Sequence, residues 1–149
     1  MLFRAVLIML ALTGAALAQD AAFAFREARG FARKVQADKA KRPLRHYWQR
    51  AIERLENVVE KHPHSPQAAE AQYLIGDLYL DMSTVSLIDD DVRSAVAAYR
   101  DVVTKFPSSR QADDAQFAIG EINRDRLHDR TGIPRSRWCL LDSLRMNFI

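Results

Sequence analysis

Apolar residues recur along the chain at spacings of three and four positions, the period of a helix that buries one face. This pattern predicts helices over residues 21–39, 44–61, 66–82, 92–105 and 109–126. Pro63 and Pro107 follow the second and fourth of them, where proline ends a helix. Ser65 and Ser109 are placed to cap the helices that come next. The sequence therefore predicts an all-α fold of about five helices.

The chain contains an internal duplication at an offset of 44 residues. Residues 51–78 read AIERLENVVEKHPHSPQAAEAQYLIGDL, and residues 95–122 read AVAAYRDVVTKFPSSRQADDAQFAIGEI. Twelve of these 28 positions are identical. A repeat of this length indicates one helical hairpin that stacks on a copy of itself, because a single hairpin cannot bury its apolar face alone.

Residues 44–123 resemble the tetratricopeptide repeat. One helix of that family reads A-x3-[FY]-x2-A-x4-P, and the other carries L-G-x2-Y. Two segments approach the first pattern, namely Ala51, Leu55, Val58 and Pro63, and then Ala95, Tyr99, Val102 and Pro107. Two segments approach the second pattern, namely Ile75, Gly76 and Tyr79, and then Ile119 and Gly120, with Asn123 in place of Tyr. The resemblance implies a short solenoid of antiparallel helices.

The period of 44 exceeds the usual 34 residues of this repeat by ten. Seven of the extra residues fall in Met82–Asp91, which we expect to form an exposed loop, with Asp89–Asp91 as a helix cap or a solvated run. Gly76 and Gly120 are expected where neighbouring helices cross most closely. Large side chains are expected to fill the core between the helices, namely Trp48, Leu55, Val58, Val59, Tyr73, Ile75, Tyr79, Tyr99, Val102, Phe106 and Phe117.

The N-terminal residues 1–18 have the features of a secretory signal peptide. Arg4 precedes an uncharged run of 14 residues that ends in Ala16-Leu17-Ala18, and a basic start, an apolar run and an A-x-A site together direct export and cleavage. The alternative is a membrane anchor, for which about 20 apolar residues are needed. We expect a cleaved signal, a periplasmic or secreted product without a stable membrane span, and an N-terminal helical segment over residues 19–43.

Composition and motifs indicate binding rather than catalysis. The formal charge is only +3, from 22 basic and 19 acidic residues, and the central region has no clustered basic face, so nucleic acid is not expected as a partner. His62 and His64 are interpreted as a loop pair, since zinc needs three or four ligands. Arg110, Asp113 and Asp114 are interpreted as a solvated helix face. No catalytic, metal or cofactor site is predicted, and Cys139, the single cysteine, can only pair between chains or remain a thiol.

Residues 124–149 depart from the repeat pattern. Between Asn123 and Ile149 the chain has six arginines, no lysine, Trp138 and Cys139. This segment is either a genuine basic C-terminal arm or the frameshifted end of a longer protein, in which case the last repeat helix would expose an apolar face.

The repeat region is also similar to a narrower family, the N-terminal repeat module of periplasmic N-acetylmuramoyl-L-alanine amidases. The matching residues are Arg45, Trp48, Ile52, Pro63, Ser65, Ala68, Pro107, Ser109, Ala112, Asp113, Asp114 and Ala115. Repeat proteins of the Tol system and of outer-membrane assembly are further resemblances. The latter are usually lipoproteins, which the lack of a cysteine after the predicted cleavage site argues against.

Three functions remain open from the sequence. The first is a cell-envelope scaffold that binds a protein or peptide partner, with self-association as a further possibility. The second is the targeting module of a peptidoglycan amidase that lacks its zinc hydrolase domain. The third, a small enzyme, is disfavoured because no nucleophile, base or metal set converges.

Overall fold

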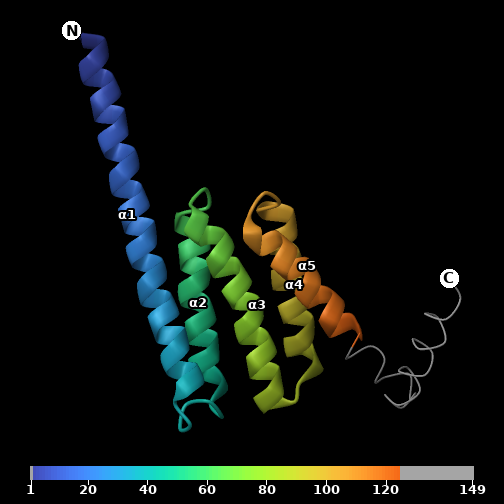
Figure 1. Ribbon diagram of the computed structural model, residues 1–149. Helices are drawn as coiled ribbons and strands as arrows, with labels where there is room; N and C mark the ends of the chain where they lie inside the picture. Colours follow the sequence, from blue (N-terminus) through green and yellow to red (C-terminus); the bar gives the residue numbers. More distant parts are fainter. Residues whose placement is uncertain (1, 125–149) are drawn as a thin grey trace, which may run out of the picture.

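The structure is a computed structural model that describes the backbone of residues 2–124 and the side chains of residues 19–124. Five helices follow one another, namely α1 (Leu2–Ala37), α2 (Arg45–Lys61), α3 (Pro66–Ser86), α4 (Asp89–Lys105) and α5 (Arg110–Ile122). The described residues form no strand, so the all-α prediction is confirmed. Successive helices lie side by side and alternate in direction (Figure 1), as in a tetratricopeptide-like solenoid.

The helices form two layers. Besides its neighbours in the chain, α3 contacts both α1 and α5. Helices α1, α3 and α5 therefore make one continuous side of the molecule, while α2 and α4 pack between them from the other side. We call the first of these the α1–α3–α5 side.

The predicted helix bounds hold to within a few residues except at the two ends. Helix α1 runs from Leu2 to Ala37, so the predicted signal segment and the helix predicted over 21–39 are parts of one continuous helix. Helix α5 is described to Ile122. The C-terminal tail beyond Arg124, with Trp138 and Cys139, lies outside the described residues.

The duplication in the sequence is repeated in the backbone. Helices α2 and α4 both contain 17 residues, and the residues that follow them, His62 and Phe106, have φ/ψ angles of −129°/51° and −130°/52°. Ser65 and Ser109 begin the next helices at −83°/150° and −82°/150°. Their hydroxyls donate back to the carbonyls of His62 and Phe106, at 2.8 Å in each copy. They occupy the predicted cap positions, but their side chains close the preceding turn instead of capping the helix.

The prediction of an exposed loop over Met82–Asp91 is wrong. Helix α3 continues to Ser86, and α4 begins at Asp89, so only Leu87 and Ile88 connect them. Leu87 takes the left-handed conformation, with φ of 56°, and its side chain is 85% exposed.

Helix α3 continues four residues past its predicted end at Met82. Met82 and Ser83 are buried at this end, whereas Val85 is exposed. Part of the insertion therefore extends the helix instead of forming a loop.

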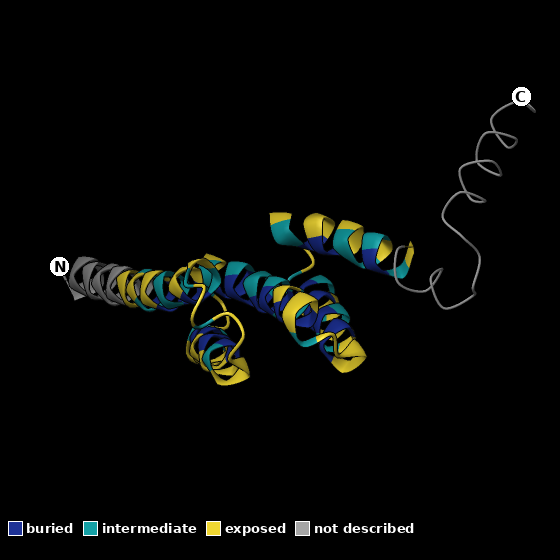
Figure 2. Cartoon of the chain, turned by 90° about the horizontal axis from the view of Figure 1, so that it is seen from below, coloured by how far each residue is buried: buried dark blue, intermediate teal, exposed yellow. Residues whose placement is uncertain are grey.

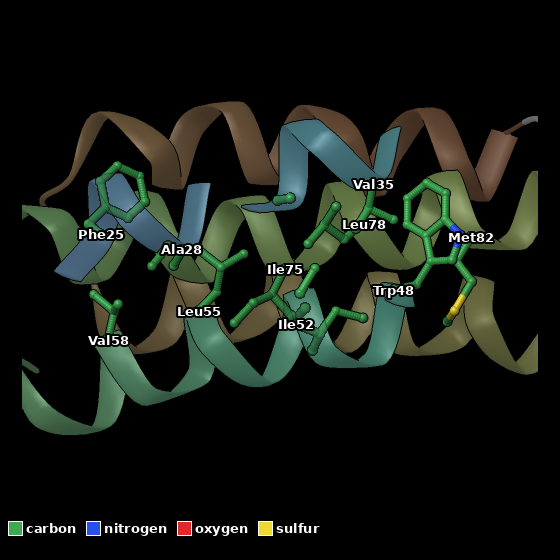
Figure 3. Close-up of a cluster of buried hydrophobic side chains, with 14 residues drawn as sticks. Phe25, Ala28, Val35, Trp48, Ile52, Leu55, Val58, Ile75, Leu78 and Met82 are labelled. Atoms are coloured by element: carbon green, nitrogen blue, oxygen red, sulfur yellow. The ribbon is translucent and has the colours of Figure 1, made fainter. Parts of the chain in front are cut away.

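Helix α3 is packed on two sides by separate clusters of apolar side chains. The first cluster comes mainly from α1, α2 and α3 and includes Trp48, Leu55 and Leu78, as Figure 3 shows. The second comes from α4 and α5 and includes Tyr99 and Val102, with partly buried residues of α3 against it. Each large side chain that leaves water in these clusters stabilises the fold by about 1.5–3 kcal/mol.

The predicted core residues are mostly confirmed. Trp48, Leu55 and Tyr99 are at most 1% exposed. Tyr73, Tyr79, Val59 and Phe106 are only partly buried. Phe117 is an error, since its side chain is 71% exposed.

Gly76 and Gly120 occupy equivalent positions of the repeat, but their surroundings differ. A Cβ atom on Gly76 would lie 2.5 Å from Cε1 of the Tyr99 ring, which confirms the close crossing of α3 and α4. A Cβ atom on Gly120 would meet nothing within 4 Å, so the close crossing expected there is wrong for the described residues.

We expect Gly76→Ala to destabilise the protein by about 1–3 kcal/mol, because the added methyl group overpacks a buried contact. Gly120→Ala is the matched control, and it should stabilise the protein by about 0.5–1 kcal/mol, since alanine favours the helix. Urea unfolding followed by circular dichroism measures both. Shifts of the same sign in the two variants would contradict the packing described here.

Candidate functional site

The described residues offer no metal centre. No three His, Cys, Asp or Glu side chains of this part of the chain are grouped as ligands for an ion. His62 lies in the turn between α2 and α3, with its Nε2 atom 3.7 Å from Oδ2 of Asp20 on α1. His64 is exposed in the same turn. Both positions agree with the interpretation of this pair as loop residues.

A charged cluster joins the start of α2 to the start of α4. Arg45 donates from Nη1 to Oδ2 of Asp91 at 2.7 Å and from Nη2 to Oδ1 at 2.6 Å. The Ser86 hydroxyl donates to Oδ2 of the same carboxylate at 2.6 Å. The guanidinium of Arg45 and the Ser86 hydroxyl hold the pKa of Asp91 below its usual value, although burial opposes this shift.

This cluster corrects the interpretation of one residue of the aspartate run, Asp91, whereas Asp89 and Asp90 are exposed as a solvated run would be. Asp91 is only 2% exposed and forms part of the first turn of α4, whose N-cap residue is Ile88. It is neither a cap nor a solvated residue. Two residues of the amidase resemblance also have structural roles, since Arg45 holds Asp91, and the buried Trp48 donates from Nε1 to the carbonyl of Arg42 at 2.8 Å.

Polar bridges connect the helices of the α1–α3–α5 side. Arg29 of α1 donates from Nη1 to Oε1 of Glu70 on α3 at 3.0 Å. Two turns further along, Gln36 donates from Nε2 to Oδ2 of Asp81 at 2.7 Å. These two contacts hold α1 beside α3 while leaving side chains exposed between them.

Two of the grooves on the described surface have volumes of several hundred Å³. One has a volume of about 390 Å³ and lies between α1 and α3, lined by Ala22, Phe25, Arg26, Arg29, Gly30, Arg33, Gln67 and Glu70. The other, of about 490 Å³, lies between the two equivalent turns that contain Pro63 and Pro107.

A carboxylate of α3 is partly buried beside two tyrosines. Asp77 accepts a hydrogen bond from the Tyr99 hydroxyl at 2.6 Å, and the ring of Tyr99 lies 5.3 Å from that of Tyr73 between centroids. Burial raises the pKa of Asp77, and the hydrogen bond from Tyr99 only partly offsets this. Burial and the neighbouring Asp77 raise the pKa of Tyr99 as well, so its hydroxyl stays a donor.

One side of α5 is exposed along its length, as Figure 2 shows. Arg110, Asp113 and Asp114 are exposed there, which confirms the predicted solvated face. Phe117 and Gly120 continue this surface with apolar atoms, so the last described helix presents an aromatic side chain to solvent.

The sequence analysis missed the arginines of α1. Arg26, Arg29 and Arg33 stand three and four positions apart, which places them on one face of a helix. This basic stripe runs beside the apolar stripe of the same helix, and its spacing of three and four residues is present in the sequence.

We expect Asp91→Ala to lower the free energy of unfolding by about 1.5–3 kcal/mol, the range for hydrogen bonds to charged groups. Arg45, whose side chain is 43% exposed, regains water in the variant, which keeps the loss moderate. Asp90→Ala is the control, because Asp90 also lies in the first turn of α4 but is 76% exposed in a surface pair with Arg93. Such pairs contribute about 0–1 kcal/mol.

The effect of Asp91 should depend on pH in a definite direction. Because its pKa is lower in the folded state than the usual 3.8, the group stabilises the fold above that pH. This contribution is lost as the pH falls through the folded-state value. Thermal unfolding of the wild type and of Asp91→Ala should therefore converge at strongly acidic pH, and a constant difference across the range would contradict the assignment.

Comparison with known proteins gives one family. Among the described helices, none is both long and apolar enough to cross a membrane. Comparison with curated proteins and with solved structures gave no significant match. The amidase resemblance finds no support, because the family that matches is a different one. Residues 18–130, more than two thirds of the chain, match the family described as YfiO, outer membrane lipoprotein, and the chain therefore belongs to this family.

Proposed function

We propose that this protein is a non-catalytic scaffold of the bacterial cell envelope, which binds another protein through the exposed face of its last described helix, α5. Two observations support the proposal. The chain belongs to a family of outer membrane lipoproteins, and its stacked helical hairpins have the architecture that other proteins use to present extended binding surfaces.

The observation that carries the proposal is the exposed aromatic surface of α5. Phe117 is 71% exposed, and the neighbouring Gly120 leaves open space where a side chain would otherwise stand. Phenylalanine is enriched in the buried cores of protein interfaces. Its ring contributes a large apolar area when a partner covers it.

The proposed location is the periplasm. Export would depend on residues 1–18, with cleavage after Ala18 and a mature chain that begins at Gln19. In this arrangement the described side chains, from Gln19 onward, all belong to the mature protein.

Cleavage is tested by the mass of the protein recovered from a bacterial periplasm. We expect a mature N-terminus at Gln19, and we expect Ala18→Leu to leave the precursor uncut, because the peptidase reads small residues at that position. Ala15→Leu makes the same change outside the positions that are read and should be processed normally. Recovery of the full-length chain from the wild type would contradict the proposal.

The binding surface is tested by site-specific photo-crosslinking in the source bacterium. A photoreactive phenylalanine analogue at Phe117 should form a crosslink to one defined envelope protein, identified by mass spectrometry. The same analogue at Glu53, an exposed position of α2, serves as the control and should not form it. Equal crosslinks from both positions would contradict a specific surface, and a product containing only this chain would indicate self-association instead.

A further inference from the structure

We propose that the groove between α1 and α3 binds an extended acidic segment of a partner protein, whose carboxylates pair with Arg26, Arg29 and Arg33. This inference rests on the proposed scaffold function, and it adds the chemistry of the partner and the residues that recognise it.

The charges that line the groove are predominantly positive. Three arginines of α1 face a single acidic residue, Glu70 of α3, so the formal charge of the lining is +2. The other lining residues carry no charge. An anionic ligand is therefore favoured here, although the net charge of the whole chain is only +3.

Two of the three guanidinium groups are available. Neither Arg26 nor Arg33 contacts a carboxylate in the described part of the chain, and both side chains are exposed. Arg29 donates to Glu70 through one nitrogen and lies over the ring of Phe25, with Cζ 5.8 Å from the centroid. This fixes Arg29 in the middle of the row and leaves donors of its planar fork for a second carboxylate.

The geometry of the row favours an extended peptide over a single phosphate group. Along α1 the rise from Arg26 to Arg33 is about 10 Å, at 1.5 Å per residue. An extended segment covers the same distance in about three residues. A phosphate is bound best where several donors converge on one point, whereas these arginines are spread along a line.

Gly30 keeps the groove open between the arginines. It lies within the row, and a Cβ atom at this position would meet nothing within 4 Å. A side chain at position 30 would therefore extend into the groove without disturbing the core. This allows a variant that blocks the groove while retaining every charge.

The test uses the full chain and a fluorescent peptide in which glutamate and serine alternate. We expect saturable binding by fluorescence anisotropy, weakened by added salt. The double variant Arg26→Gln/Arg33→Gln should weaken binding by about tenfold or more, since each lost ion pair costs affinity. Gly30→Leu should weaken it as well. The control Arg50→Gln/Arg100→Gln removes the same charge from exposed positions of α2 and α4 and should bind almost as tightly as the wild type.

Three outcomes would overturn the inference. The first is equal weakening in the control and groove variants, which would reflect net charge alone. The second is undiminished binding by Gly30→Leu. The third is binding to vesicles of anionic lipid, lost in the double variant, without binding to the peptide, which would identify a membrane surface as the ligand. Circular dichroism of each variant establishes that it is folded.

Failure of the groove and failure of the scaffold function are distinguishable. If crosslinking from Phe117 captures a partner equally well in the wild type and in both groove variants, and the peptide does not bind, the scaffold function stands and the groove assignment falls. If the peptide binds as expected but no partner is crosslinked, the scaffold function fails while the groove retains its affinity for acidic segments.

Discussion

The close approach of α3 and α4 at Gly76 is the contact on which the rest of the structure depends. The Tyr99 ring occupies the space that a side chain at position 76 would need. The Tyr99 hydroxyl donates a hydrogen bond to Asp77, and the Tyr99 ring contacts the ring of Tyr73. Tyr73, Gly76 and Asp77 of α3 therefore all contact Tyr99 of α4. Because α3 also packs against α1 and α2, this contact joins the two clusters of apolar side chains into one stack.

A second link spans the same junction through charge. Arg45 of α2 and Ser86 of α3 both bind the carboxylate of Asp91 on α4. A carboxylate as little exposed as this one is stable only when it is paired and hydrogen-bonded, so the three helices are held in one arrangement at this end. The short connection through Leu87 and Ile88 lies at the same end, and Leu87 adopts a left-handed conformation there.

The contacts between α1 and α3 on the surface are polar, and this is where we expect a partner protein to bind. Apolar contacts hold α2 and α4 against their neighbours, whereas α1 and α3 are bridged on the surface by Arg29–Glu70 and Gln36–Asp81. A surface of this kind stays hydrated and keeps charged groups accessible to a partner. The exposed Phe117 of α5 and the arginine groove of α1 are two separate surfaces that a partner can reach.

The sequence by itself determined the presence of the helices, the ends of α2 and α4 before Pro63 and Pro107, and the duplication, because helical periodicity and the steric limits of proline act over a few residues. Tertiary structure alone decided which side chains at matching positions of the two repeats are buried by a neighbouring helix. Tyr73 and Phe117 stand 44 residues apart in matching sequence, yet Tyr73 packs beneath α4, while Phe117 is 71% exposed. The ion pair between Asp91 and Arg45 could not be predicted from the sequence either. The two residues are 46 positions apart, and only the stacking of α2, α3 and α4 brings their charges together.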